Sequence, residues 1–213
     1  MWQEQAEQFL KISEQFRLGD LPTEQQNPRT LRLSELAKTN LNEAIDTLLA
    51  VERSALDVLL AQSDRLDALA LDIEMTLDRG GRIFFCGCGA TGRLSLSLER
   101  LWRELVGKND ERVFSFMAGG DYALVHSIEN FEDFPEYGAR QLTDLGFADG
   151  DLLISTTEGG ETPFVIGATL EAAKISSNRP YFLYCNPDRV LTEKLERCRQ
   201  VIYNDRIKKY LLK

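Results

Sequence analysis

Five short apolar runs follow residue 81 and set the pattern of the rest of the chain. They lie at residues 82–86, 112–117, 151–155, 181–185 and 201–203. The runs are nearly continuous, with little alternation of apolar and polar positions, which is typical of strands covered on both faces of a parallel sheet. Helical patterns separate the runs, over roughly 91–106, 135–146, 162–176 and 189–198. This alternation predicts an α/β fold in which five parallel strands form a doubly wound sheet.

An aliphatic stripe with helical spacing precedes the sheet. Leucine and isoleucine recur at three- and four-residue steps from Leu41 to Leu77, with a break or a second helix cap at Ser63-Asp64. The glycines that follow Asp78 are typical of a helix C-terminus. We expect this stripe to pack in the core of its own domain, and a surface for another subunit is the alternative.

The first forty residues differ from the rest of the chain. A short helical pattern is followed by a polar stretch that Pro22 and Pro28 interrupt, which predicts an irregular arm that lies on a neighbour and is no core element. A mobile tail fits the same composition. We therefore divide the chain into an N-terminal helical arm, residues 1–40, and an α/β domain, residues 41–213. Because residues 205–213 can only begin a final helix, we expect this domain to lack its C-terminal helical cover.

Composition narrows the range of partners and compartments. The 213 residues contain 25 Lys and Arg against 34 Asp and Glu, a net charge of −9, which argues against nucleic acid or an anionic membrane surface as a partner. No apolar run reaches the ~18 residues of a membrane span. The acidic, amphipathic N-terminus does not have the form of a signal peptide. The four cysteines follow no zinc spacing, so we expect no metal site. They also make no disulfide framework, which together with the N-terminus and the lack of a membrane span predicts a cytoplasmic protein.

The loop after the first predicted strand carries the clearest candidate chemistry. In an open parallel sheet, ligands bind beyond the carboxyl ends of the strands. The segment Cys86-Gly-Cys-Gly-Ala-Thr-Gly-Arg93 joins a strand to a helix, so its glycines expose backbone N–H groups at a helix N-terminus, which attracts anions. Its candidate binding residues are Gly87, Gly89, Ala90, Thr91 and Arg93. A dinucleotide site would require an acidic residue after the next strand, where Met117-Ala-Gly-Gly120 stands, so we expect no cofactor.

A second loop, after the third predicted strand, is rich in hydroxyl groups. Threonines and glycines precede a helix that has Pro163 in its first turn, where proline is favoured. Such a turn can bind phosphate through neutral donors. Glu161 suits the helix dipole, whereas Glu158 is placed to accept a hydrogen bond from a sugar hydroxyl. The candidate binding residues of this loop are Thr156, Thr157, Glu158, Gly159, Gly160 and Thr162.

Carboxylates and one histidine follow the second predicted strand. The acidic residues Glu129, Glu132 and Asp133 can supply a general base, although a solvated acidic face explains them as well. His126 is the single histidine of the chain. A surface position accounts for it better than a catalytic role.

Several motifs of this chain match one known family. The matching segments are Leu21-Pro-Thr-Glu24, Asn27-Pro28, Gly87–Leu94, Ala118–Ala123, Glu132-Asp133, Thr162–Ile166 and Cys185–Pro187. They resemble the SIS (sugar isomerase) domain family, in particular the branch of N-acetylmuramic acid 6-phosphate etherase and glucokinase regulatory protein. The resemblance implies a flavodoxin-like strand order, a phosphosugar ligand held by the two loops, and a homodimer. The phosphate is then expected at Thr91, Thr157 and Thr162, and the sugar at Glu132 or Glu158.

Two departures from the family pattern bear on catalysis. The etherase carries a catalytic glutamate eight residues after the loop arginine, and Leu101 holds that position here. Glu99, two residues earlier, lies about 200° away around a helix. Gly159 replaces a phosphate-binding serine of the second loop. The second etherase carboxylate matches Glu132, which is therefore the candidate catalytic residue.

Two classes of function stay open, and a truncated, inactive remnant is a third possibility. The first is a regulatory or sensor protein that binds a phosphorylated sugar or amino-sugar derivative, and Leu101 favours it. The alternative is a phosphosugar-processing enzyme, either an etherase-like lyase or an aldose–ketose isomerase. In the enzyme, Glu132 or Glu158 would abstract a proton next to the sugar carbonyl carbon, which requires one base with a suitable pKa.

Overall fold

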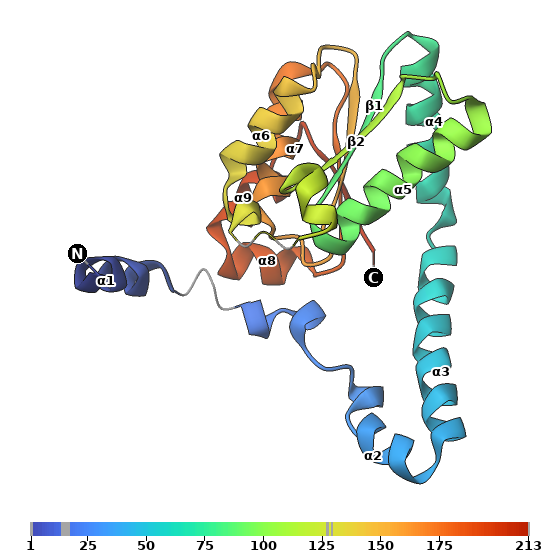
Figure 1. Cartoon of the computed structure of the whole chain (residues 1–213), viewed down its shortest axis with the longest axis vertical. Helices are drawn as coiled ribbons and strands as arrows, with labels where there is room; N and C mark the ends of the chain where they lie inside the picture. Colours follow the sequence, from blue (N-terminus) through green and yellow to red (C-terminus); the bar gives the residue numbers. More distant parts are fainter. Residues whose placement is uncertain (1, 14–17, 127, 129, 213) are drawn as a thin grey trace.

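The computed structural model describes residues 2–13, 18–126, 128 and 130–212. A five-stranded sheet lies at its centre, with the strand order β2-β1-β3-β4-β5 and every neighbouring pair parallel (Figure 1). The strands are β1 (Ile83–Gly87), β2 (Val113–Met117), β3 (Leu152–Thr156), β4 (Tyr181–Tyr184) and β5 (Lys208–Leu211). This is the flavodoxin-like order, so the predicted fold class is confirmed. The order reverses between β1 and β3, and ligands of such sheets bind at this point.

Helices cover both faces of the sheet, which explains the apolar runs of the strands. One face packs against α4 (Ser63–Asp78) and α5 (Gly89–Val106), through side chains that include Leu69, Ile73 and Trp102. The other face packs against helices on its opposite side, which are α6 (Pro135–Asp144), α7 (Pro163–Ile175), α8 (Asp188–Lys194) and α9 (Glu196–Ile202). Phe84 and Phe182 are fully buried there. Each such ring contributes about 1.5–3 kcal/mol to folding through the apolar surface it removes from water.

The position of the fifth strand was predicted wrongly. Val201 and Ile202 were expected in a strand, but they end α9 and pack into the core. The strand is instead β5, within the segment that was expected to begin a final helix. β5 is an edge strand in which Lys208 and Lys209 are only half-buried, so it has no continuous apolar run. Inner strands are covered by helices on both faces and therefore have continuous apolar runs that the sequence shows. An edge strand lacks such a run.

The aliphatic stripe divides into two helices with different surroundings. It breaks between α3 (Leu41–Leu60) and α4, next to Ser63 as predicted. α4 packs on the sheet, whereas α3 runs away from it (Figure 1) and has Ala44 as its buried residue. Core packing was therefore the wrong expectation for α3. In the described part of the chain, no helix is long and apolar enough to cross a membrane.

The N-terminal segment combines short helices with one core residue. Its elements are α1 (Trp2–Ile12), the 3-10 turns η2 (Leu18–Asp20), η3 (Pro22–Glu24) and η4 (Pro28–Thr30), and α2 (Leu33–Thr39). Leu21 is 1% exposed and belongs to the main hydrophobic core. The expectation of a segment that adds nothing to the core is therefore wrong for residues 18–24, which pack on the domain itself.

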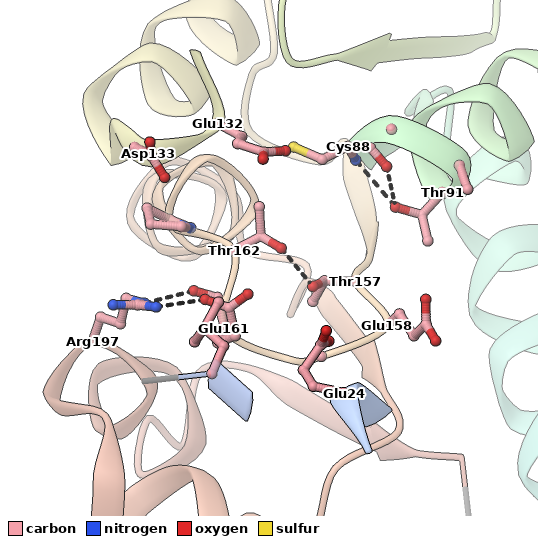
Figure 2. A pocket seen from close by; sticks show the side chains of 15 residues that line it. Glu24, Cys88, Thr91, Glu132, Asp133, Thr157, Glu158, Glu161, Thr162 and Arg197 are labelled. Carbon is pink, nitrogen blue, oxygen red and sulfur yellow. Dashed lines mark hydrogen bonds and ion pairs between the residues drawn. The ribbon is translucent and has the colours of Figure 1, made fainter. Parts of the chain in front are cut away.

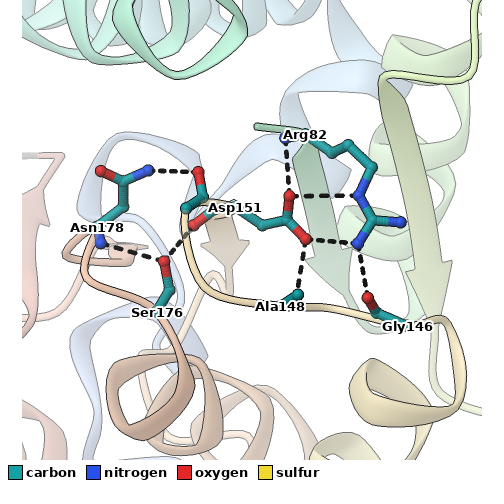
Figure 3. Close-up of polar contacts among 7 residues, drawn as sticks. Arg82, Gly146, Ala148, Asp151, Ser176 and Asn178 are labelled. Atoms are coloured by element: carbon teal, nitrogen blue, oxygen red, sulfur yellow. Dashed lines mark hydrogen bonds and ion pairs between the residues drawn. The ribbon is translucent and has the colours of Figure 1, made fainter. Parts of the chain in front are cut away.

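A buried carboxylate fixes the amino edge of the sheet, where the strands begin. Asp151 accepts hydrogen bonds from the Arg82 backbone N–H at 2.8 Å, from the Arg82 guanidinium at 2.6 and 3.2 Å, and from the Ala148 N–H at 2.9 Å (Figure 3). The carbonyl of Asp151 accepts from the Ser176 hydroxyl at 2.6 Å. These bonds connect the beginnings of β1 and β3 with the loop that precedes β4.

Candidate functional site

The predicted loops meet in one pocket at the carboxyl edge of the sheet. This carboxyl-edge pocket encloses about 340 Å³ and lies where β1 and β3 end and where α5 and α7 begin (Figure 2). Its lining residues are Leu18, Glu24, Cys88, Gly89, Ala90, Thr91, Glu132, Asp133, Thr157, Glu158, Gly159, Glu161, Thr162, Pro163 and Arg197. The pocket therefore combines two helix N-termini with the hydroxyl-rich loop.

Glycines allow α5 to approach the ends of β1 and β2 closely. A Cβ on Gly87 would lie 2.5 Å from the carbonyl carbon of Thr91, and a Cβ on Gly92 would lie 2.6 Å from the Met117 Cβ. Gly89 has a φ of 48°, in the left-handed region that favours glycine. The first turn of α5 thus lies directly above the end of β1. Backbone N–H groups in a first turn have no partners within the helix and can bind an anion at the pocket.

Thr91 uses its hydroxyl to cap α5. The Oγ1 atom accepts from the Cys88 N–H at 3.1 Å and donates to the Cys88 carbonyl at 2.9 Å (Figure 2). A hydroxyl has one hydrogen to donate, and that of Thr91 is donated to a carbonyl within the turn. Its role at the pocket is therefore to shape the turn and to present its backbone.

The loop between β3 and α7 places two hydroxyls side by side. Thr157 Oγ1 and Thr162 Oγ1 are 2.9 Å apart. Thr157 is 2% exposed, and its backbone N–H donates to the Leu183 carbonyl at 3.0 Å, so its position is fixed by β4. Because one hydrogen is enough for the bond between the two oxygens, the other hydroxyl hydrogen can be donated to a ligand.

Arg197 neutralises one of the two loop glutamates. Its guanidinium lies 2.5 Å from a carboxylate oxygen of Glu161 and donates through Nε to the Glu161 carbonyl at 2.7 Å. Both side chains are less than a fifth exposed. The sequence analysis did not identify Arg197, because it reaches the loop from α9, 36 residues further along the chain.

The N-terminal segment brings a further carboxylate, Glu24, to the pocket. Asn186 is fully buried and donates through Nδ2 to Thr23 Oγ1 at 2.8 Å and to the Gly159 carbonyl at 2.9 Å. Its Oδ1 accepts from the Thr23 N–H at 3.2 Å. Asn186 therefore joins the segment before Glu24 to the loop that carries Thr157. Glu24 was missed as a site residue, although the motif that contains it had been noted.

The pocket has a strong negative charge. Glu24, Glu132, Asp133 and Glu158 line it in addition to the paired Glu161, and Arg197 is the one cation among its lining residues. Burial, together with the charges of Glu132, Glu161 and Asp133, raises the pKa of the Cys88 thiol to about 12. Figure 2 shows the Glu132 carboxylate pointing towards the Cys88 sulfur. An anion in this pocket must therefore be held by N–H and O–H dipoles at the helix N-termini.

The predicted candidates fall into two groups by position. The pocket is lined by Gly89, Ala90, Thr91, Glu132, Thr157, Glu158, Gly159 and Thr162. Gly87, Thr156 and Gly160 lie outside its lining, and Arg93 lines an adjoining cavity of about 260 Å³ together with Gly89 and Glu132. Glu129 lies outside the described residues. His126 is exposed and contacts Tyr122, with ring centroids 4.8 Å apart and ring planes tilted by 34°.

No carboxylate replaces the family glutamate on α5. Leu101 is 52% exposed and lines a shallow apolar hollow outside the carboxyl-edge pocket. Glu99 pairs with Arg103 at 2.9 Å and accepts from the Ser115 hydroxyl on β2. Within residues 2–13, 18–126, 128 and 130–212, no group of three or more His, Cys, Asp or Glu side chains is arranged to hold a metal ion.

Comparisons with known proteins agree with this geometry. Residues 68–174 match a family model described as the glucokinase regulatory protein N-terminal SIS domain. An N-acetylmuramic acid 6-phosphate etherase of Aliivibrio fischeri is 32% identical over 177 residues, which are 83% of this chain and 57% of that protein. The etherase of Rippkaea orientalis is 36% identical over 174 residues, which are 79% of this chain and 54% of that protein. This chain thus spans little more than half the length of these curated relatives.

The fold also has counterparts among solved structures. Phosphoheptose isomerase of Neisseria gonorrhoeae superposes with a TM-score of 0.56 at 17% identity, over 81% of this chain and 86% of that one. Phosphoheptose isomerase of Francisella tularensis gives a TM-score of 0.53 at 18% identity, over 80% and 86%. At this identity the likeness concerns the arrangement of strands and helices alone.

Proposed function

We propose that this chain, which belongs to the SIS domain family, binds a phosphorylated sugar or amino-sugar derivative in the carboxyl-edge pocket. Its membership follows from the match to the model of the glucokinase regulatory protein N-terminal SIS domain. The observation that carries this proposal is the convergence of the α5 N-terminus with the Thr157–Thr162 hydroxyl pair on one cavity. The names of two similar proteins, N-acetylmuramic acid 6-phosphate etherase and phosphoheptose isomerase, support the same class of ligand.

The charge of the pocket determines the orientation of this ligand. Its phosphate group lies against the N–H groups of residues 89–91 and the hydroxyls of Thr157 and Thr162, which are neutral donors. The sugar ring lies towards Glu132 and Glu158, whose carboxylates accept hydrogen bonds from ring hydroxyls or from an amino group. A reversed orientation would place the phosphate dianion among carboxylates and is disfavoured by charge repulsion.

Within this class we favour a regulatory or sensor role. The etherase resemblance requires a glutamate at the position of Leu101, which here is exposed and outside the pocket. Glu99, the nearest carboxylate on α5, is engaged by Arg103 and Ser115. A pocket that has lost this acid–base group can retain its affinity, because the phosphate donors lie on other residues.

The alternative is a phosphosugar-processing enzyme, and the position of Glu132 favours it. Glu132 lines both the carboxyl-edge pocket and the adjoining cavity that contains Arg93. A carboxylate at the junction of two cavities can reach a carbon of a bound sugar and act as its general base. One base of this kind is sufficient for an isomerase.

A thermal-shift panel tests the binding proposal. The chain is melted with several sugar phosphates, with the same unphosphorylated sugars and with inorganic phosphate. A ligand at ~100 times its dissociation constant adds about 2.7 kcal/mol to the free energy of unfolding, which raises the Tm by a few degrees. We expect this rise with at least one sugar phosphate and none with its unphosphorylated sugar. A cooperative melt that no sugar phosphate shifts would refute the proposal.

Two variants locate the ligand. Thr157→Val removes the buried hydroxyl at nearly constant volume and should reduce the ligand-induced rise in Tm, measured from the variant's own melting temperature. The matched control is Thr143→Val, on the exposed surface of α6, whose hydroxyl bonds to carbonyls of its own helix. An equal rise in both variants would show that the ligand binds elsewhere.

Glu132→Gln separates the two roles, with Glu136→Gln as its control outside the pocket lining. A sensor keeps its ligand affinity within a few-fold in Glu132→Gln and shows no turnover in either form. An enzyme consumes the ligand, and Glu132→Gln abolishes that turnover while Glu136→Gln does not. The readout is NMR of the sugar phosphate incubated with the full chain.

We also propose that the chain forms a homodimer, since α3 presents an uncovered apolar stripe. Its exposed members are Leu41, Ile45, Leu48, Leu49, Leu56 and Leu59. Burial of such a stripe against a second copy stabilises an assembly at about 25 cal/mol per Å². Sedimentation of the wild type should give a dimer, Leu49→Glu should shift it towards the monomer, and Glu52→Ala on the same helix should not. A monomeric wild type would refute this part of the proposal.

A further inference from the structure

A second cavity lies at the opposite, amino edge of the sheet. This amino-edge pocket encloses about 190 Å³, near the beginnings of β3, β4 and β5. It is lined by Asp72, Met75, Thr76, Arg79, Leu152, Ser177, Asn178, Arg179 and Lys208. None of these residues lines the carboxyl-edge pocket, so the two cavities are independent.

The charges of the amino-edge pocket are the reverse of those at the carboxyl edge. Arg79, Arg179 and Lys208 line it against one carboxylate, that of Asp72. The chain as a whole has a net charge of −9. Three cations around one small cavity therefore stand out from a predominantly acidic protein and create a local positive potential.

The single carboxylate of this pocket is already neutralised. Asp72 forms an ion pair with Lys208 and accepts a hydrogen bond from the Tyr181 hydroxyl at 2.7 Å. Burial raises the pKa of Asp72, but the hydrogen bonds from Lys208 and Tyr181 outweigh it and lower that pKa overall. Asp72 therefore remains ionised and fixes Lys208 in place. The charge of Arg179 also lowers the pKa of Asp72, but one carboxylate faces three cations, so the pocket keeps an excess of positive charge.

In the described part of the chain, neither arginine side chain is held by a hydrogen bond or an ion pair. Both side chains are exposed, and among the described residues none forms a hydrogen bond or an ion pair with the Arg79 or Arg179 guanidinium. Arg79 caps the C-terminus of α4, where a cation also suits the helix dipole. Arg179 precedes Pro180, which restricts its backbone to extended conformations and holds it at the beginning of β4.

Hydrogen bonds to the protein itself fix the base of the pocket. The Asn178 side chain donates to the Gly150 carbonyl at 2.7 Å, and the Asn178 N–H donates to the Ser176 hydroxyl at 3.1 Å (Figure 3). Ser177, which lines the pocket, has its backbone fixed by a bond to Asp149 at 2.7 Å. The Ser177 hydroxyl also bonds to Asp149 and lowers the pKa of that carboxyl group, so the two guanidinium groups are the donors of this pocket.

We propose that the amino-edge pocket is a second anion site, which binds a phosphoryl group through Arg79 and Arg179. Guanidinium groups match phosphate oxygens in a bidentate manner, and their charge-assisted hydrogen bonds are stronger than neutral ones. Free inorganic phosphate and a phosphate monoester share this chemistry. The site does not depend on the function proposed for the carboxyl-edge pocket.

Calorimetric titration of the full chain tests the proposal, with inorganic phosphate in one arm and glycerol 3-phosphate in the other. We expect Arg79→Gln and Arg179→Gln each to weaken binding by about ten-fold, as the loss of one charge-assisted hydrogen bond predicts. Arg53→Gln, an exposed arginine on α3, is the matched control and should change the affinity less than about two-fold. Tighter binding in the second arm would identify an organic ester as the ligand.

Two further measurements separate this site from the carboxyl-edge pocket. Thr157→Val should leave the affinity for inorganic phosphate unchanged, and the backbone amides of residues 177–179 and 208 should shift in NMR spectra on titration. No binding up to about 10 mM of either anion would refute the second site. Binding that is lost in Thr157→Val and kept in Arg179→Gln would refute it too, because the anion would then occupy the carboxyl edge.

Discussion

The two edges of the sheet differ in how each can hold an anion. At the carboxyl edge, five acidic side chains and one arginine line the pocket, and the donors are backbone N–H groups and threonine hydroxyls. At the amino edge, three cations face a single carboxylate that is already paired. Dipoles fixed by the backbone select an anion by geometry, whereas exposed cations attract any anion of suitable size. The comparison predicts selective binding at the proposed carboxyl-edge site and permissive binding at the proposed amino-edge site.

Each edge is also organised around one buried polar side chain. Asp151, 4% exposed, receives four hydrogen bonds at the amino edge (Figure 3). Asn186, fully buried, makes three at the carboxyl edge. One of these residues is charged and the other is neutral, so their removal should have different costs.

The largest effect is expected for Asp151→Ala. This change leaves the partly buried Arg82 guanidinium without its carboxylate, and such a loss typically costs about 3–5 kcal/mol of unfolding free energy. Urea denaturation followed by circular dichroism measures it. Asp144→Ala removes an exposed ion pair with Arg140 and should cost at most about 1 kcal/mol. Equal costs in the two variants would show that Asp151 does not fix the amino edge.

A smaller loss is expected for Asn186→Ala, at about 1–3 kcal/mol, because it leaves the Thr23 N–H and the Gly159 carbonyl without their partner. Hydrogen exchange should increase in residues 18–24, and phosphosugar binding should weaken through the loop. Asn27→Ala, which removes an exposed cap in the same N-terminal segment, is the control and should change neither. Unchanged exchange in Asn186→Ala would show that the segment is held by Leu21 alone.

The sequence predicts what depends on local pattern. The inner strands follow from continuous apolar runs, and the two ligand loops follow from glycine and threonine clusters between a strand and a helix. The edge strand β5 could not be predicted in this way, because its half-buried lysines leave it without an apolar run. Val201 and Ile202 were predicted in a strand but end α9, because a buried helix end and a buried strand contain the same apolar residue types.

Residues that tertiary contacts bring to a site could not be predicted in this way. Glu24 reaches the carboxyl-edge pocket through Thr23 and Asn186, which are 163 residues apart in the chain. Arg79, Arg179 and Lys208 meet at the amino edge from three separate segments. No motif connects such residues, since their proximity is a consequence of strand order. The loops of the proposed carboxyl-edge site can therefore be predicted from the sequence, whereas the cations of the proposed amino-edge site are brought together only by the fold.

Salt should separate the two sites. Raising NaCl from about 0.05 to about 0.5 M shortens the Debye length several-fold and should weaken phosphate binding at the exposed arginines by about ten-fold. Phosphosugar binding at the carboxyl edge should change only a few-fold, since its donors are uncharged. Titrations at the two salt concentrations measure both effects. An equal salt dependence at the two edges would contradict the distinction between charge and dipole.

The smallest expected effect is a gain in affinity from Gly159→Ser, which adds the hydroxyl that the family pattern has at this position. A Cβ on Gly159 would have ordinary contacts, 3.4 Å from the Glu161 Cγ and 3.9 Å from the Asn186 Nδ2, so the variant should fold normally. One additional hydrogen bond is worth about 0.5–1.5 kcal/mol, or roughly a two- to ten-fold increase in phosphosugar affinity.

The neighbouring glycine provides the control for this gain. Gly160 has a φ of 78°, and a Cβ there would lie 2.8 Å from the Leu191 Cδ1, so Gly160→Ser should destabilise the loop and weaken binding. The affinity for inorganic phosphate at the amino edge should not change in either variant. If Gly159→Ser leaves phosphosugar affinity unchanged while Gly160→Ser lowers it, the phosphate lies against α5 and Thr157 alone. If Gly159→Ser weakens binding, the added hydroxyl occupies space that the ligand needs, and the phosphate lies closer to residue 159 than its neutral donors indicate.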